Sequence, residues 1–176
     1  MKKILFFFLI IAARCSKIAD PEAIAQKEIE SWKQQAAGIT IIRDTYGVAH
    51  VYGKTDADAV FGLMYAQCED DFKRVERNYV WAIGRLAEVE GVEALYSDLR
   101  ARLFMTEQEA IAYYEQSPEW LKDLCNAYAD GINYFLHTHP EVKPDLLTRF
   151  EPWMTMYFTE GSIGGDIERV STRRIK

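Results

Sequence analysis

Cysteine is scarce in this sequence, with three residues among 176, which excludes a small domain packed around disulfides. Positive charge is also in short supply, because 21 Lys and Arg against 27 Asp and Glu give a net charge of -6, and no basic stripe is present. The chain is therefore a poor candidate for binding nucleic acid. Hydrophobic residues make up 49% of the sequence, and aromatic residues make up 13%. That composition is typical of a globular chain with a substantial core, and not of a disordered or collagen-like one.

Long apolar runs are missing as well. Residues 4–13 form an apolar run of ten, whereas a membrane-spanning helix needs about 20. Two lysines precede the run, which therefore fits the h-region of a bacterial export signal, with a buried core segment as the alternative. Cys15 follows in a context similar to a lipoprotein signal, except that Arg14 stands where that motif has a small residue. We therefore predict a signal peptide over residues 1–15, with Cys15 as a candidate for lipidation, and a periplasmic, outer-surface or membrane-anchored location.

A β-hairpin is the first predicted element of the domain. Residues 16–37 are polar and alanine-rich, and they are predicted to form a spacer or a short helix before it. Residues 39–42 and 48–52 have the β-branched composition of strands, and a turn ends at Gly47 between them. Gly47 is expected to take a positive φ, and Asp44 to accept hydrogen bonds from amides of its own turn.

The rest of the chain has the periodicity of helices. Thr55 with Asp58, and Thr106 with Glu109, have the spacing of capping boxes, and Pro118 is expected at the first position of a later helix. The first long helix is predicted to bury Phe61, Met64, Cys68, Phe72, Val75 and Tyr79. The later helix is predicted to bury Leu121, Leu124, Tyr128, Ile132 and Phe135. The predicted fold class is α+β, an N-terminal hairpin followed mostly by helices. Because a lone hairpin is marginal in water, the chain is expected to be part of a larger sheet protein.

Common catalytic and metal-binding motifs are absent from the sequence. No Gly-rich loop ends in Lys-Ser/Thr, and the segment 161–164 misses the Gly-x-Ser-x-Gly spacing by one residue. The three histidines form no metal-ligand cluster, and His137 and His139 are expected on the surface. Asp70 and Asp71 can be interpreted as paired catalytic carboxylates, but solvated helix charges are the better interpretation.

Five segments in order along the chain carry a more specific signal. They are residues 41–53 (IIRDTYGVAHVYG), 61–67 (FGLMYAQ), 84–88 (GRLAE), 128–133 (YADGIN) and 150–153 (FEPW). Together they resemble the penicillin acylase family over about residues 39–168, beginning with its Arg-Asp-x-x-Gly-Val-Pro-His-Ile hairpin. Ala49 stands where the family usually has proline.

This resemblance implies the α-subunit part of an αββα N-terminal-nucleophile hydrolase. In that family one precursor cuts itself into α and β subunits, and the first residue of β, a serine, attacks the amide with its own amine as base. Residues 38–176 match the α-subunit region alone, which would be incomplete without a β subunit from the same precursor. No residue here is assigned as catalytic, Ser162 included, so the chain alone is expected to be inactive. With its partner it would cleave linear amides (EC 3.5.1 type), either penicillin-like or N-acyl-homoserine-lactone-like.

The resemblance also implies two binding sites near the C-terminal end. Tyr157, Phe158 and Ile163 are expected to wall the pocket for the acyl group, with core packing as the alternative for the two aromatic residues. Asp166 and Glu168 resemble the acidic piece that carries a calcium ligand in the family, and hard oxygen ligands suit calcium. No cofactor is expected to be required for the chemistry, and the small-molecule acyl amide is the expected ligand.

A second interpretation is a truncated, non-catalytic helical binding module of the cell envelope. It is motivated by residues 169–176, which carry four basic residues and show no match to the junction with β. An in-frame continuation of the gene into a junction and a β region would favour the enzyme.

Overall fold

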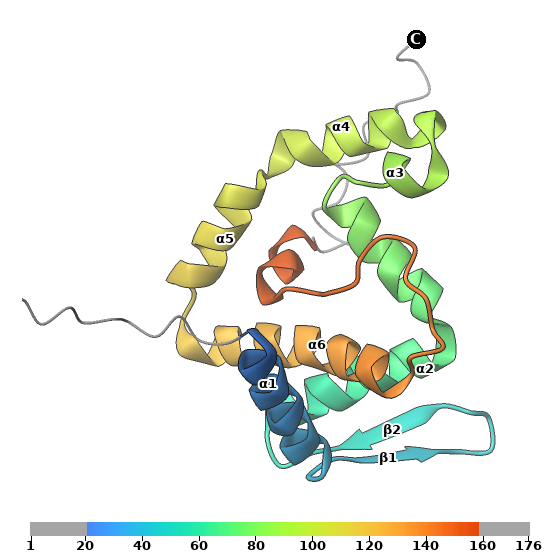
Figure 1. Ribbon diagram of the computed structural model, residues 1–176, viewed down its shortest axis with the longest axis vertical. Coiled ribbons are helices and arrows are strands. Elements are labelled where there is room, and N and C mark those ends of the chain that lie inside the picture. The colour runs from blue at the N-terminus through green and yellow to red at the C-terminus, as the bar shows by residue number, and fades with distance from the viewer. Residues whose placement is uncertain (1–20, 159–176) are drawn as a thin grey trace, which may run out of the picture.

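The computed structural model describes residues 21–158, which form a mostly helical body with one β-hairpin (Figure 1). This confirms the predicted α+β class. The elements in chain order are α1 (Pro21–Ala36), β1 (Thr40–Arg43), β2 (Ala49–Tyr52), α2 (Asp56–Ala82), α3 (Ala87–Glu90), η1 (Val92–Ala94), α4 (Leu95–Phe104), α5 (Glu107–Gln116), α6 (Glu119–Thr138) and η2 (Pro152–Tyr157). Among the described helices, none has both the length and the hydropathy needed to cross a membrane.

The core lies where α2 and α6 cross. The six residues predicted to form the apolar stripe of the first long helix are all buried in α2. On α6, Ile132 and Phe135 are buried, while Leu121, Leu124 and Tyr128 are half-buried. The two helices approach closely because Gly131 lacks a side chain: a Cβ atom there would lie 2.4 Å from the carbonyl oxygen of Phe61.

Both predicted capping boxes are present. Thr55 and Asp58 exchange hydrogen bonds at the start of α2, and Thr106 and Glu109 do the same at the start of α5. The start of α6 differs by one residue from the prediction. Pro118 is the N-cap and not the first helical residue, because its ψ of 153° is extended.

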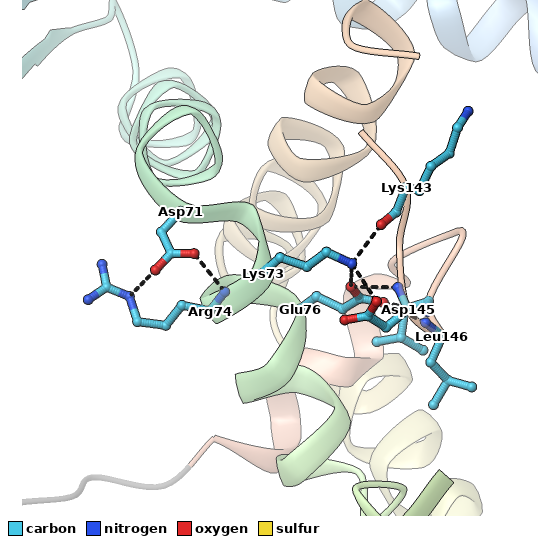
Figure 2. A network of polar contacts seen from close by, with 8 residues as sticks. Asp71, Lys73, Arg74, Glu76, Lys143, Asp145 and Leu146 are labelled. Carbon is cyan, nitrogen blue, oxygen red and sulfur yellow. Dashed lines mark hydrogen bonds and ion pairs between the residues drawn. The ribbon is translucent and has the colours of Figure 1, made fainter. Parts of the chain in front are cut away.

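The hydrophobic periodicity predicted one continuous helix over α2, but the helix is kinked at Asp71. This residue has φ −164° and ψ 79°, outside the helical region. Its carboxylate accepts a hydrogen bond from the Arg74 amide at 3.1 Å, as the N-cap of a new helix would (Figure 2). Asp71 therefore starts the second half of α2 in a new direction, and both halves keep their apolar face on the core.

The hairpin is antiparallel, with Thr40 opposite Tyr52 and Arg43 opposite Ala49. Within the described residues it is the whole sheet, so neither strand has an outer neighbour there. Ile42 and Tyr52 are both more than half exposed. The segment predicted to be a spacer or a short helix contains α1, whose Trp32 is buried against Phe61 and Ala127.

Candidate functional site

The Arg-Asp motif that carries much of the family resemblance is structural at the hairpin tip. Asp44 accepts hydrogen bonds from the amides of Tyr46 (2.8 Å) and Val48 (3.0 Å), and Gly47 has φ +82°. Both observations confirm the sequence-based expectations for this turn. The Tyr46 amide is the main cause that lowers the pKa of the Asp44 carboxyl, with a smaller contribution from His50.

Arg43 turns away from its neighbour Asp44 and reaches α2. Its guanidinium lies 3.0 Å from the Glu69 carboxylate and 2.8 Å from that of Asp70, and it donates to the Ala66 carbonyl at 3.3 Å. The Glu69 hydrogen bond is the main cause that raises the pKa of Arg43. Arg43 thus fastens the hairpin to α2 just before the kink. Asp70 and Asp71, considered above as catalytic carboxylates, serve as an ion-pair partner and a helix cap.

The chain between α6 and η2 is held by buried polar side chains. The Glu76 carboxylate is 1% exposed and accepts hydrogen bonds from the amides of Asp145 (2.9 Å), Leu146 (2.7 Å) and Leu147 (2.9 Å). Lys73 beside it donates to the carbonyl of Lys143 at 2.7 Å and pairs with Asp145 (Figure 2). These contacts fix residues 143–147 on the second half of α2.

Asn133 of α6 fixes the last part of this connection. Its amide group donates to the Phe150 carbonyl at 2.8 Å and accepts from the Phe150 amide at 2.9 Å, so it pairs with the backbone as a neighbouring strand would. The Phe150 ring then packs edge-on against Tyr79, with ring centres 4.9 Å apart. Together these contacts set the position from which η2 begins.

Between η2 and the α4–α5 corner lies a cavity of about 530 Å³. The corner is visible where α4 meets α5 in Figure 1, with η2 on its inner side. Half of the lining is apolar or aromatic: Ile83, Met105, Trp153, Met154 and Tyr157. The other half is polar: Arg85, Arg102, Thr106, Glu107 and Gln108.

Three of the polar residues of the cavity, Arg85, Arg102 and Thr106, are engaged with partners of their own. Arg85 forms a bidentate ion pair with Glu88, with hydrogen bonds of 2.6 and 2.7 Å. The contact with Arg85 lowers the pKa of the Glu88 carboxyl. Arg102 donates to the Gly84 carbonyl at 3.0 Å, and the Thr106 hydroxyl is used in its capping box. Burial is the main cause that raises the pKa of Tyr157. The lining is suited to holding an apolar or aromatic group, and its one aliphatic hydroxyl, that of Thr106, is used in a helix cap.

The predicted pocket residues occupy different places. Tyr157 lines the cavity, whereas Phe158 packs edge-on against Tyr79 with ring centres 4.9 Å apart. Ile163, the calcium candidates Asp166 and Glu168, and the lipidation candidate Cys15 lie outside the described residues. Within residues 25–158, no three His, Cys, Asp or Glu side chains gather as a metal site would require.

Most of the cavity lining was missed by reasoning from the sequence. Arg85 and Trp153 lie inside segments that resemble the family, so the motifs pointed near them without giving a role. Arg102 and Met105 carry no local signal at all. They reach the cavity because α4 packs across the C-terminal end of α2 and the adjoining Gly84, a contact that no short pattern encodes.

The chain belongs to the penicillin amidase family, whose model matches residues 38–170. It is 29% identical over 119 residues to an acyl-homoserine lactone acylase QuiP from Pseudomonas fluorescens, a match covering 67% of this chain and 15% of that protein. It is 31% identical over 101 residues to a penicillin acylase 2 proenzyme from Pseudomonas sp., covering 57% of this chain and 13% of the proenzyme. The match therefore spans about one seventh of the length of these relatives.

A solved structure has the same fold. A thermostable penicillin G acylase from Alcaligenes faecalis superposes with a TM-score of 0.58 at 22% sequence identity. The match covers 68% of this chain and 68% of that one. The hairpin followed by crossing helices is thus the arrangement of an acylase chain.

Proposed function

We propose that this chain is the α-subunit portion of an exported amide hydrolase. Its substrate would be an amide with a removable acyl group, of the penicillin or N-acyl-homoserine-lactone kind. The observation that carries the proposal is the family match over residues 38–170, together with relatives that are named as acylases. The two names among the relatives differ in substrate, so the proposal covers both kinds of amide.

The chemistry is assigned to a partner polypeptide, the β subunit, which would supply a serine at its amino terminus. That serine would attack the amide carbonyl, its own amine would take the proton, and water would then release the acyl group. The name of one relative includes the word proenzyme, which favours processing of a longer precursor. The hairpin, without outer neighbours among the described residues, would continue into a sheet shared with β.

The role of this chain would be to wall the acyl pocket. Tyr157, Trp153 and Met154 supply apolar surface to the cavity beside η2, and such surface can exclude water and set a preference for acyl length. Ile163 would extend this wall. A structural calcium at Asp166 and Glu168, export by residues 1–15 and lipidation of Cys15 stay predictions.

The test is to isolate the tagged chain from its own host with whatever is bound to it, and to assay hydrolysis of a phenylacetyl anilide and a long-chain N-acyl homoserine lactone. We expect the complex to hydrolyse one of them and the recombinant 176-residue chain alone to hydrolyse neither. Turnover by the chain alone, or a complex inactive on both, would contradict the proposal. The second outcome would favour a non-catalytic binding module.

The pocket assignment is tested in the same complex. Tyr157→Ala should alter the ratio of kcat/KM between short and long acyl groups by roughly tenfold, because each methylene in a pocket changes binding by about 1–3 kcal/mol. Tyr113→Ala on α5 is the control, since Tyr113 is 57% exposed and does not line the cavity. An unchanged ratio in Tyr157→Ala would remove this residue from the pocket.

A further inference from the structure

Helix α4 presents its apolar residues outward. Its one buried residue is Asp98, while Leu95, Tyr96, Leu99 and Leu103 are 41–84% exposed. Val92 in η1 precedes them and is 74% exposed. We call Val92, Leu95, Tyr96, Leu99 and Leu103 the α4 apolar stripe. Their spacings of 3, 1, 3 and 4 residues place them along one side of the helix.

Polar contacts of Asp98 and Arg102 with the segment that follows α2 hold α4 in this orientation. The buried Asp98 carboxylate accepts hydrogen bonds from the amides of Leu86 (2.7 Å) and Ala87 (2.8 Å). Arg102, one turn further, donates to the Gly84 carbonyl at 3.0 Å. Rolling the helix to bury its leucines would break these bonds and leave polar groups without partners, at a cost of about 1–3 kcal/mol for each buried group. The stripe is therefore a fixed feature of the folded chain.

The stripe is large for a surface that stays in water. Five such side chains present on the order of 500 Å² of mostly apolar surface, near the upper limit of patches on ordinary monomers. A patch of this size is comparable to the largest patch on a typical monomer, and such patches are often functional. The stripe is smaller than the about 800 Å² per partner of a standard protein interface. Two copies meeting through it alone would therefore associate weakly.

A lipid surface suits the stripe poorly. Amphipathic helices that lie on membranes carry Lys and Arg on their polar face. Between residues 89 and 104 the basic residues are Arg100 and Arg102, against three acids. Arg102 is bonded to Gly84, and Arg100 lies over the Trp81 ring at 5.9 Å. A larger protein partner, able to extend beyond the stripe, fits these features better.

We propose that the α4 apolar stripe is a docking surface for the polypeptide that forms the remainder of an acylase. The relatives supply the reason: the matched region makes up 13–15% of their length, so most of each relative lies outside it. This inference rests on the proposed function, because it names a surface by which the same partner would be held. Helix α4 lies at the opposite end of the molecule from the hairpin, so the partner would contact the chain at both ends (Figure 1).

The test places the photo-crosslinker p-benzoylphenylalanine at Leu99 or at Leu103, in the chain expressed from its own gene in its own host. Ser31, exposed on α1, is the control position. We expect light-dependent crosslinks from Leu99 and Leu103 to peptides of a penicillin-amidase-family sequence beyond the region matched here. Crosslinks to a second copy, to lipid or to residues of this chain would overturn the inference, as would their absence or an equal yield from Ser31.

A paired variant measures the same surface by affinity. Leu99→Glu combined with Leu103→Glu should weaken association with the partner tenfold or more, because a desolvated apolar contact would gain two charges. Tyr113→Glu on α5 is the matched control, and it should change the affinity for the partner little. The double variant should keep the melting temperature of the parent chain, since both leucines are exposed. Unchanged association in a stable double variant would overturn the proposal.

These outcomes separate the inference from the function on which it rests. A complex that crosslinks through the stripe but hydrolyses neither amide would support the docking surface and contradict the proposed activity. An active complex whose crosslinks avoid the stripe would support the proposed activity and contradict the docking surface.

Discussion

At the scale of single residues, the polar side chains in the core act as backbone partners. Glu76, Asp98 and Asn133 are the buried polar or charged residues among those described, and each pairs with main-chain groups of a connecting segment. Loops carry amides that no helix or strand satisfies, and buried carboxylates and amides are a compact way to satisfy them. The cavity beside η2 depends on this arrangement, because two of these residues fix the path leading into η2.

Glu76 offers the clearest test of that role. Glu76→Ala would leave three amides without their acceptor, so we expect the free energy of unfolding to fall by about 3 kcal/mol. The measurement is urea unfolding of the full chain followed by tryptophan fluorescence. Glu30→Ala is the control, because Glu30 is exposed and makes a surface pair with Lys33. Equal effects of the two substitutions would contradict the role assigned to Glu76.

Cys68 leads to a pH prediction. Burial raises the pKa of the Cys68 thiol from 9.0 to about 12. Above pH 9 the unfolded chain therefore loses a proton that the folded chain keeps, so stability should fall as the pH rises from 9 toward 12. By pH 10 the loss from this thiol should be about 1 kcal/mol. We expect urea midpoints to decline from pH 8 to pH 10 and the decline to be shallower in Cys68→Ala. An identical decline would contradict the assignment.

At the scale of elements, the hairpin turn depends on backbone conformation. No atom outside its neighbouring residues lies within 4 Å of the position a Cβ would take at Gly47, so a side chain there meets no obstacle in space. The constraint is the φ of +82°, which residues other than glycine adopt at a cost.

Gly47→Ala should accordingly destabilise the chain by about 1 kcal/mol. Gly38→Ala, at the end of α1, is the matched control, since Gly38 has no positive φ and its added Cβ would lie 3.4 Å from the Gln35 carbonyl oxygen. Differential scanning calorimetry of both variants would measure the difference. In an active complex the rate per titrated active site should stay unchanged in Gly47→Ala. A large drop in that rate with normal folding would place the turn in the chemistry.

At the scale of the whole molecule, α1 belongs to the folded body. Trp32 is 8% exposed and packs with Phe61 and Ala127 in a second apolar cluster. Glu28 of the same helix accepts two hydrogen bonds from Arg149, both at 2.9 Å, across 121 residues of sequence. Helix α1 thereby links the start of the described chain to the segment before η2.

Trp32→Ala should destabilise the chain by about 3 kcal/mol, because it leaves a cavity between α1, α2 and α6. Trp120→Ala provides the contrast, since Trp120 is 64% exposed. Chemical unfolding monitored by circular dichroism would measure both. If the two substitutions had equal effects, α1 would have to be a detachable spacer.

Local patterns in the sequence determined the elements. Thr55 and Thr106 each stand three residues before their capping partner, Gly47 ends a turn of four residues, and the apolar stripe of α2 repeats every three or four residues. All of these are interactions within one or two turns of chain, so a short window of sequence contains both partners. The family resemblance added the hairpin-and-helix arrangement and named Tyr157 as a candidate for the pocket, which stays a prediction.

The tertiary structure decided the partners and the burial of side chains that contact residues far away in the sequence. Arg43 could have paired with its neighbour Asp44, but the docking of the hairpin on α2 brings it to Glu69 and Asp70. In the sequence, Glu76 looks like an ordinary charged residue of a helix. In the structure it accepts a hydrogen bond from the amide of Leu147, 71 residues away. Distant partners also decide the exposure of the α4 apolar stripe and the positions of Arg102 and Met105 in the cavity lining. Their environment is made by segments that meet only after folding, because burial and hydrogen-bond geometry are set by the packing of whole elements and not by neighbours in the chain.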